Sequence, residues 1–186
     1  MNPQMLTKAV VFATDAHHGQ TRKYTGEPYI HHPIAVAKIV ADFGGDLNQI
    51  IAAYLHDTVE DVQRVTHAII QASFGEDVGM LVEGLTKDEY PKGTKRVDKK
   101  RMEASRLAKT NGRVQTVKCA DIIHNSGSII QHDTQFASVY LEENKRAVEA
   151  MTGADTAIRD YALATLNAEL AKLRVLMGDT YSPLGE

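Results

Sequence analysis

The chain has 186 residues and a formal net charge of −3 at pH 7, with 43% hydrophobic and 24% charged residues. We expect one domain over residues 1–186 with a sizeable core, and this composition excludes global disorder. The charge excludes an electrostatic surface for non-specific nucleic-acid binding, and no apolar run approaches the length that spans a bilayer.

Apolar residues recur mainly at helical spacing, and glycines fall where these runs end. The pattern predicts helices at about 3–18, 32–43, 47–58, 66–74, 76–85, 98–109, 114–130, 136–151 and 155–177. Asp46 precedes the third of these, and Gln49 follows it at the spacing of a capping box. Residues 20–31 read as a polar loop and residues 87–97 as a basic one. No segment alternates convincingly with a period of two, so we expect an all-α bundle of roughly eight to ten helices.

The stretch 54–62 (Tyr-Leu-His-Asp-Thr-Val-Glu-Asp-Val) ends an apolar helical run in one imidazole and three carboxylates. His56 lies one helical turn from Glu60, and Asp57 lies one turn from Asp61, so all four are expected to project from one end of one helix. Burying such charges without a partner costs several kcal/mol, and a metal ion is one suitable partner. A solvated acidic helix end is the other interpretation, and this stretch alone does not choose between them.

Two residues elsewhere suit the same metal site. His32 stands beside Pro33 at a helix start, and Asp121 lies within an otherwise apolar run where a free carboxylate is costly. Two imidazoles and two carboxylates suit Mn²⁺, Fe²⁺, Zn²⁺ or Mg²⁺, ions that lower the pKa of water and polarise phosphoryl oxygens. The simpler alternatives are a helix-capping role for His32 and an ion pair with Lys118 for Asp121.

The single cysteine, Cys119, excludes an intramolecular disulfide and a thiolate zinc cluster. We expect it to be a small core residue without a catalytic role. A chain with this cysteine usage is expected in the reducing cytoplasm.

Four segments, in order along the chain, carry a resemblance to a known family. They read Ala-His-His-Gly-Gln-Thr-Arg-Lys-Tyr-Thr-Gly-Glu-Pro-Tyr-Ile-His-His-Pro (16–33), His-Asp-Thr-Val-Glu-Asp (56–61), Gly-Leu-Thr-Lys (84–87) and Val-Lys-Cys-Ala-Asp-Ile-Ile-His-Asn (117–125). They resemble the HD-type hydrolase domain of the RelA/SpoT superfamily, which removes the 3′-pyrophosphate from the alarmones ppGpp and pppGpp in the stringent response. The resemblance covers about residues 9–150 and implies an HD-type helical domain with metal-dependent phosphohydrolase activity.

The resemblance also implies roles for individual residues. The implied ligands of one divalent ion, typically Mn²⁺, are His32, His56, Asp57 and Asp121. Glu60 and Asp61 match the acidic pair that activates or orders the attacking water. Arg22 and Lys23 match a basic pair near the nucleotide, and Asn125 matches a nucleotide-contacting asparagine.

The stretch 87–101 is rich in positive charge. Its basic residues are Lys87, Lys92, Lys95, Arg96, Lys99, Lys100 and Arg101, against three acidic residues. Arg96 is our choice for a phosphate contact, and a solvated loop is the alternative. Ile122 and Ile123 stand where the family more commonly has Arg-Leu, which affects the pocket wall and no ligand.

Three functions remain open at this stage. The first is alarmone hydrolysis by a stand-alone small alarmone hydrolase, since 186 residues leave no room for the synthetase and regulatory domains of long family members. The second is an HD phosphohydrolase with a shifted substrate such as ppApp or NADPH, and the third is a catalytically silent alarmone sensor, against which the intact residue set argues. We expect a small nucleotide as partner, with no nucleic acid and no membrane. The sequence leaves open whether the amphipathic helix at 155–177 packs only in the core or also serves a homo-oligomer.

Overall fold

The computed structural model describes residues 3–178 and 181, and these residues form an all-α fold. The helices are α1 (Pro3–Ala16), α2 (His31–Asp42), α3 (Leu47–Leu55), α4 (Thr58–Asp61), α5 (His67–Phe74), α6 (Glu76–Leu85), α7 (Arg96–Leu107), α8 (Gly112–Ser126), α9 (Ile129–His132), α10 (Thr134–Ala150) and α11 (Thr156–Met177). Two of them, α4 and α9, have four residues each, which leaves nine longer helices in the described part of the chain. The predicted all-α class is confirmed.

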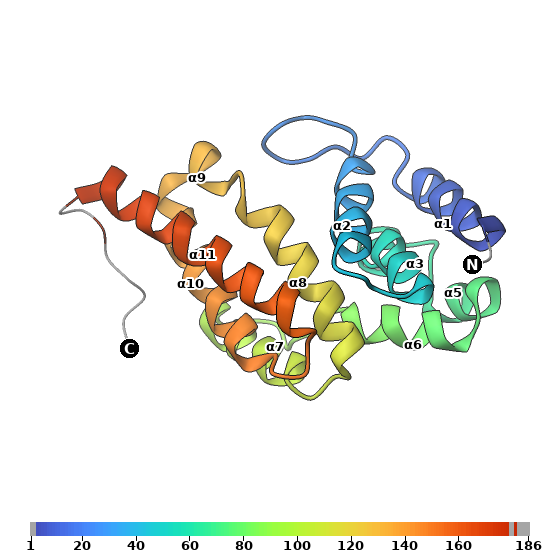
Figure 1. The fold of residues 1–186 in the computed structure, drawn as a ribbon. Helices are drawn as coiled ribbons and strands as arrows, with labels where there is room; N and C mark the ends of the chain where they lie inside the picture. The colour runs from blue at the N-terminus through green and yellow to red at the C-terminus, as the bar shows by residue number, and fades with distance from the viewer. Residues whose placement is uncertain (1–2, 179–180, 182–186) are drawn as a thin grey trace.

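Helix α8 runs through the middle of the molecule (Figure 1). It contacts α2, α3 and α6 on one side and α10 and α11 on the other. Val117, Ala120 and Ile122 are almost fully buried because both sides of α8 are covered. The same helix carries Asp121 into the interior, where that residue is 7% exposed.

The capping box at the start of α3 is present as predicted. Asp46 Oδ1 accepts hydrogen bonds from the backbone N–H groups of Asn48 and Gln49, and Gln49 Oε1 accepts one from the Asp46 backbone. These bonds fix where α3 begins. Its buried face, which includes Ile51 and Leu55, then leads directly to His56.

The predicted continuous helix over 47–58 is wrong. Helix α3 ends at Leu55, α4 begins at Thr58, and the Thr58 hydroxyl donates to the Leu55 carbonyl oxygen at 2.7 Å. This side-chain bond competes with the regular helical ladder. His56 and Asp57 therefore lie in a break between two helices.

Other helix boundaries also differ from the predicted ones. The helix predicted over 114–130 is divided, because α8 ends at Ser126 and α9 starts at Ile129. Helix α7 begins at Arg96, two residues before the predicted start, because extended backbone at Lys95 ends the preceding loop.

Helix α11 packs its apolar stripe into the core, as the sequence predicts. Leu166, Leu170 and Leu173 are at most 3% exposed, and α11 contacts both α8 and α10. Cys119 is also fully buried, and burial raises the pKa of its thiol to about 12. Among the described residues, no helix combines the length and apolar character needed to cross a membrane.

Candidate metal centre and adjoining pocket

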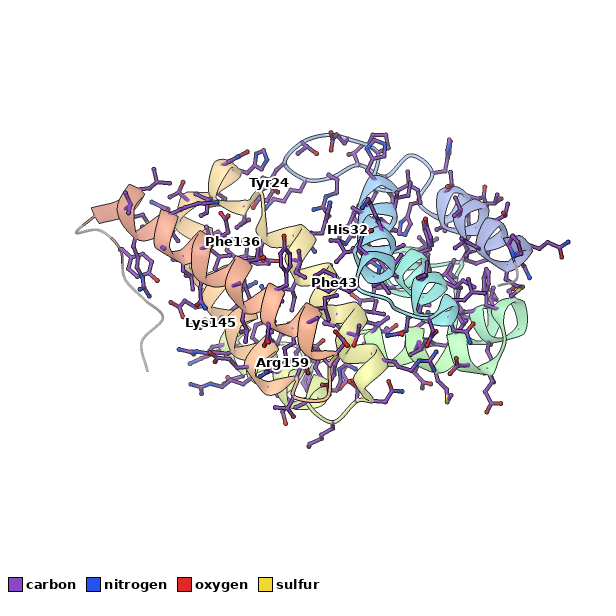
Figure 2. All side chains as sticks on the ribbon, viewed as in Figure 1. Tyr24, His32, Phe43, Phe136, Lys145 and Arg159 are labelled. Atoms are coloured by element: carbon purple, nitrogen blue, oxygen red, sulfur yellow. The ribbon has the colours of Figure 1, made fainter. Side chains whose placement is uncertain are left out.

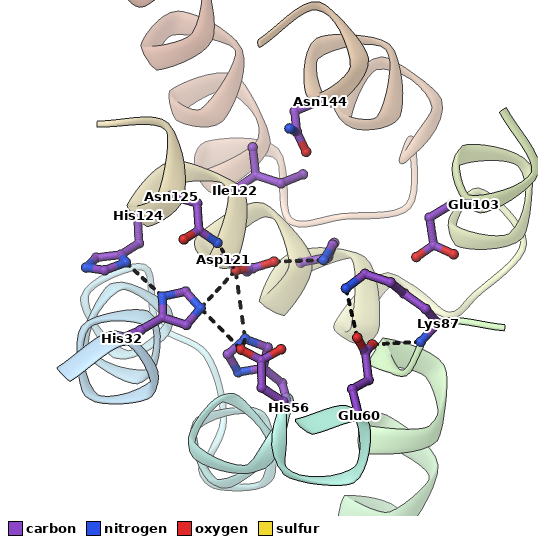
Figure 3. Close-up of polar contacts among 12 residues, drawn as sticks. His32, His56, Glu60, Lys87, Glu103, Asp121, Ile122, His124, Asn125 and Asn144 are labelled. Atoms are coloured by element: carbon purple, nitrogen blue, oxygen red, sulfur yellow. Dashed lines mark hydrogen bonds and ion pairs between the residues drawn. The ribbon is translucent and has the colours of Figure 1, made fainter. Parts of the chain in front are cut away.

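Four side chains from three separate parts of the chain meet, one of them carried by α8 (Figure 3). His32 comes from the first turn of α2, His56 and Asp57 from the break after α3, and Asp121 from α8. His32 Nε2 lies 3.2 Å from Asp121 Oδ1 and 3.5 Å from Asp57 Oδ2. His56 Nε2 lies 3.1 Å from Asp57 Oδ2 and 3.8 Å from Asp121 Oδ1. The structure thus brings together all four residues for which the sequence suggested a metal.

The hydrogen bonds of the imidazoles orient one nitrogen of each ring toward this cluster. His56 Nδ1 lies 2.8 Å from the Ala53 carbonyl oxygen, so Nδ1 carries a proton and Nε2 is the nitrogen that a metal ion can take once Nε2 is deprotonated. His32 Nδ1 lies 2.8 Å from His124 Nδ1. Burial, followed by the charges of His32 and Arg22, lowers the pKa of His124 to about 4, so a neutral His124 accepts the proton of His32 Nδ1.

The two carboxylates of the cluster remain ionised. Burial raises the pKa of both, but His56 beside Asp57 and Lys118 beside Asp121 outweigh burial and hold both pKa values well below the usual range. Lys118 Nζ lies 2.7 Å from Asp121 Oδ2, and Asn125 Nδ2 donates to Asp121 Oδ1 at 2.6 Å. Asp121 is therefore both a member of the cluster and a partner of Lys118, so the two interpretations of its sequence position are compatible.

This donor set fits a divalent cation. Ligand atoms of His32, His56 and Asp57 all lie within 4.8 Å of one another, and Asp121 Oδ1 adjoins both imidazoles. His56 Nε2 is buried and has no hydrogen-bond partner of acceptable geometry among the described residues. An ion among two nitrogen and two oxygen donors would satisfy this atom.

Glu60 and Asp61 lie on α4, directly after the break. Glu60 accepts two hydrogen bonds from Lys87, one from the backbone N–H and one from Nζ, each at 2.8 Å (Figure 3). Removal from water raises the pKa of Asp61, and the charges of Asp57 and Glu60 raise it further. Sequence reasoning missed the contact of Lys87 with Glu60, although Lys87 closes the Gly-Leu-Thr-Lys motif.

A cavity of about 360 Å³ adjoins the cluster. Its lining residues are Arg22, Lys23, Tyr24, Thr25, Tyr29, Asn125, Ser128, Ile129, Phe136 and Tyr140. Tyr24 comes from the loop before α2 and Phe136 from α10, and Figure 2 labels both together with His32. Arg22 Nη2 donates to Asn125 Oδ1 at 2.8 Å, so the cavity is joined to Asp121 through Asn125.

Arg96 lies apart from the four candidate metal ligands. Its guanidinium binds both carboxylate oxygens of Glu143, at 3.1 and 2.6 Å, and lies over the Phe136 ring. Phe136 lines the first cavity, whereas Arg96 lines a second cavity of about 380 Å³ with Lys87 and Lys100. The structure groups Arg22, Lys23 and Asn125 but places Arg96 in this neighbouring basic cavity.

Sequence reasoning did not single out Tyr29, whose hydroxyl donates to Asp57 Oδ2 at 2.6 Å. Burial, followed by the charge of Asp57, raises the pKa of Tyr29, so the hydroxyl keeps its proton. The sequence signal for Tyr29 was its position within the 16–33 motif. Tyrosine is an uncommon metal ligand, and its contact with Asp57 joins residues 28 positions apart, so the sequence did not indicate this contact.

The chain is similar to curated proteins over part of its length. The 83-residue match to a probable guanosine-3′,5′-bis(diphosphate) 3′-pyrophosphohydrolase of Synechocystis sp. is 49% identical and covers 45% of this chain and 11% of that protein. The bifunctional (p)ppGpp synthase/hydrolase SpoT of Escherichia coli is 41% identical over 126 residues, which are 64% of this chain and 17% of that protein. The chain thus spans less than a fifth of the length of these two curated relatives.

A solved structure matches nearly the whole chain. It belongs to a metazoan ortholog of SpoT that is described as hydrolysing ppGpp, with 26% identity and a TM-score of 0.75. The match covers 94% of this chain and 96% of that one. The family model described as "HD domain" matches residues 9–149, which include every residue of the cluster. The chain belongs to the HD domain family.

Proposed function

We propose that this protein removes the 3′-pyrophosphate of ppGpp and pppGpp in a metal-dependent hydrolysis that yields GDP or GTP and pyrophosphate. The observation that carries this proposal is the meeting of His32, His56, Asp57 and Asp121 beside a cavity that contains Arg22 and Asn125. The similarity to ppGpp hydrolases over most of the chain supports the choice of substrate.

In this proposal one divalent ion is held by His32 Nε2, His56 Nε2 and one oxygen each of Asp57 and Asp121. Mn²⁺ is the ion that we propose within the class that suits these donors. When bound, it supplies a Lewis acid that polarises a phosphoryl oxygen and makes water more acidic. His124 and the Ala53 carbonyl hold the two imidazoles in the tautomer that presents Nε2.

Glu60 and Asp61 orient the attacking water and accept its proton in this proposal. Lys87 fixes the Glu60 carboxylate through two hydrogen bonds, which limits the rotation of that side chain. The raised pKa of Asp61 makes its carboxylate a better proton acceptor than a fully solvated aspartate. Water then attacks the phosphorus attached to the 3′-oxygen, and the bond between that phosphorus and the 3′-oxygen breaks. The nucleotide leaves with a protonated 3′-hydroxyl, and the attacking oxygen stays in the released pyrophosphate.

We assign the nucleoside end of the substrate to the 360 Å³ cavity. Arg22, which lies 5.8 Å from the centre of the Tyr29 ring, offers a planar cation to a purine face, and Asn125 offers hydrogen bonds. Lys23 adds positive charge at the rim. Arg96 contacts a phosphate from the neighbouring basic cavity, where Lys87 and Lys100 add to the charge.

The test uses metal-stripped protein and ppGpp, with and without Mn²⁺, and separates the products by anion exchange. Mn²⁺-dependent formation of equal amounts of GDP and pyrophosphate is the expected result. Tight binding of ppGpp without turnover would replace the proposal with a sensor function. If the metal-loaded protein neither binds nor cleaves ppGpp, the same assay with ppApp and NADPH tests a shifted substrate.

Two features of the proposal rest on the sequence. A single domain over residues 1–186 and a cytoplasmic location stay predictions, and the sequence leaves open whether the protein forms a homo-oligomer. Size-exclusion chromatography with light scattering at several protein concentrations measures the oligomeric state directly.

A further inference from the structure

The hydroxyl of Tyr29 contacts the carboxylate oxygen that faces the imidazoles. Tyr29 Oη lies 2.6 Å from Asp57 Oδ2, and the same oxygen lies 3.1 Å from His56 Nε2 and 3.5 Å from His32 Nε2. We propose that Tyr29 is a positioning residue of the metal centre: its hydroxyl fixes the rotation of the Asp57 carboxylate, so that Oδ2 faces the ion. The inference rests on the metal centre of the proposed function.

Asp57 needs such a support more than Asp121 does. The last torsion of an aspartate side chain is broad, so a carboxylate turns unless hydrogen bonds hold it. Asp121 has Lys118 on one oxygen and Asn125 on the other. Within the part of the chain that the structure describes, Tyr29 supplies the one hydrogen bond to the Asp57 carboxylate from outside the four-residue cluster.

Tyr29 itself is held firmly. Its ring packs on His17, with centroids 4.8 Å apart, and meets the edge of His32 at 5.8 Å. Its backbone N–H donates to the Gln20 carbonyl oxygen, and the side chain of Gln20 contacts both His17 and the Asp61 backbone. The direction of the hydroxyl is therefore set by contacts that do not involve Asp57.

The position of Tyr29 also joins the metal centre to the cavity. The Tyr29 hydroxyl contacts Asp57, and the centre of the Tyr29 ring lies 5.8 Å from the guanidinium carbon of Arg22. Tyr29 lines the cavity that we assign to the nucleoside. A single side chain therefore contacts a proposed metal ligand and the wall of the substrate cavity.

Replacing Tyr29 by phenylalanine removes the hydroxyl and keeps the ring contacts with His17 and His32. Loss of a hydrogen bond to a metal ligand typically weakens metal affinity by about 10- to 100-fold. We expect a weakening within this range for Tyr29→Phe. The ring packing is retained, so the metal-free variant should stay folded, with an unfolding temperature lowered only by the loss of one hydrogen bond to a carboxylate.

The experiment measures the dissociation constant for Mn²⁺ on metal-stripped, full-length protein by titration calorimetry, without nucleotide. The matched control is Tyr54→Phe, which removes a hydroxyl from half-buried Tyr54 on α3, a residue that packs against the core and lines neither cavity. Weaker Mn²⁺ binding by Tyr29→Phe, with wild-type affinity in Tyr54→Phe, is the expected result. Thermal unfolding of the metal-free forms shows whether each variant is folded.

Equal Mn²⁺ affinities of folded Tyr29→Phe and wild type would overturn the inference, as would a wild type that binds no divalent ion. ppGpp hydrolysis by the wild type is measured separately. A wild type that binds Mn²⁺ but leaves ppGpp intact contradicts the proposed function, while the difference between Tyr29→Phe and wild type still decides the role of Tyr29.

Discussion

Lys118 Nζ lies 2.7 Å from Asp121 Oδ2, whereas the other oxygen of that carboxylate, Oδ1, is the one that lies nearest the two imidazoles. Both side chains are nearly buried, with exposed fractions of 14% for Lys118 and 9% for Asp121. Burial lowers the pKa of Lys118, but the charge and hydrogen bond of Asp121 outweigh burial and raise it above its usual value, so the ammonium stays charged. Asp121 is thus held in place by a cation that leaves its other oxygen available.

Lys118→Met should destabilise the metal-free protein. Removing one partner of a buried ion pair leaves an uncompensated charge and costs about 3–5 kcal/mol of unfolding free energy. Urea unfolding in the presence of a chelator measures this loss. The matched control is Lys172→Met, which breaks the more exposed pair with Glu169 and should change stability by less than about 1 kcal/mol. Equal effects of the two substitutions would show that Lys118 does not compensate a buried charge.

Asp57→Ala and Glu60→Ala should separate metal binding from water activation. Asp57→Ala removes a proposed ligand, so Mn²⁺ binding and ppGpp turnover should both be lost. Glu60→Ala should keep the metal and lose about 10²- to 10⁴-fold in rate, because only the group that orients water is removed. Metal content by mass spectrometry and product formation by anion exchange report the two effects, and exposed Asp160→Ala serves as control. Full activity in Asp57→Ala would contradict the site assignment.

Mn²⁺ binding should weaken on acidification. Burial lowers the pKa of His56, but the nearby carboxylates of Asp57 and Asp121 outweigh burial and raise it to about 10 in the metal-free protein. His56 must lose this proton before Nε2 can bind a metal ion. Below that pKa the logarithm of the association constant should therefore rise by about one per pH unit. Titrations between pH 6 and 8 test this slope, and an affinity independent of pH would argue against His56 as a ligand.

Glu103 should contribute stability that acid removes. Burial raises its pKa, but the two hydrogen bonds and the charge of Arg106 outweigh burial and leave the pKa below the ordinary value of 4.5. A carboxyl group with a lowered folded-state pKa stabilises the fold above its unfolded-state pKa and loses this contribution as pH falls through the folded-state value.

Glu103→Gln should therefore destabilise the protein by about 1.5–3 kcal/mol at pH 7, and the difference from wild type should shrink as the pH falls below 4.5. Denaturant unfolding at pH 7 and at acid pH measures both values. Glu89→Gln, on an exposed loop residue, should have little effect at either pH. A difference between Glu103→Gln and wild type that is constant with pH would show that the ion pair with Arg106 is not its cause.

Much of the fold follows from local sequence. Helix α6 has the predicted bounds Glu76–Leu85, and the Asp46–Gln49 capping box starts α3 as predicted. Apolar periodicity and capping residues act within a few positions along the chain, so a single sequence contains the information for them. The candidate ligands were also found from sequence, because an ionisable residue within an apolar run, such as Asp121, needs a partner.

The sequence by itself determined an all-α chain and a set of ionisable residues that suits a divalent ion. Only the tertiary structure decided how their surroundings are arranged: Tyr29 contacts Asp57 across 28 residues, Lys87 contacts Glu60 across 27, and Arg96 pairs with Glu143 across 47. The division between α3 and α4 likewise depends on a side-chain bond from Thr58 that helical periodicity does not show. Periodicity reports which face of a helix is buried, whereas the packing of helices around α8 determines which distant side chains meet.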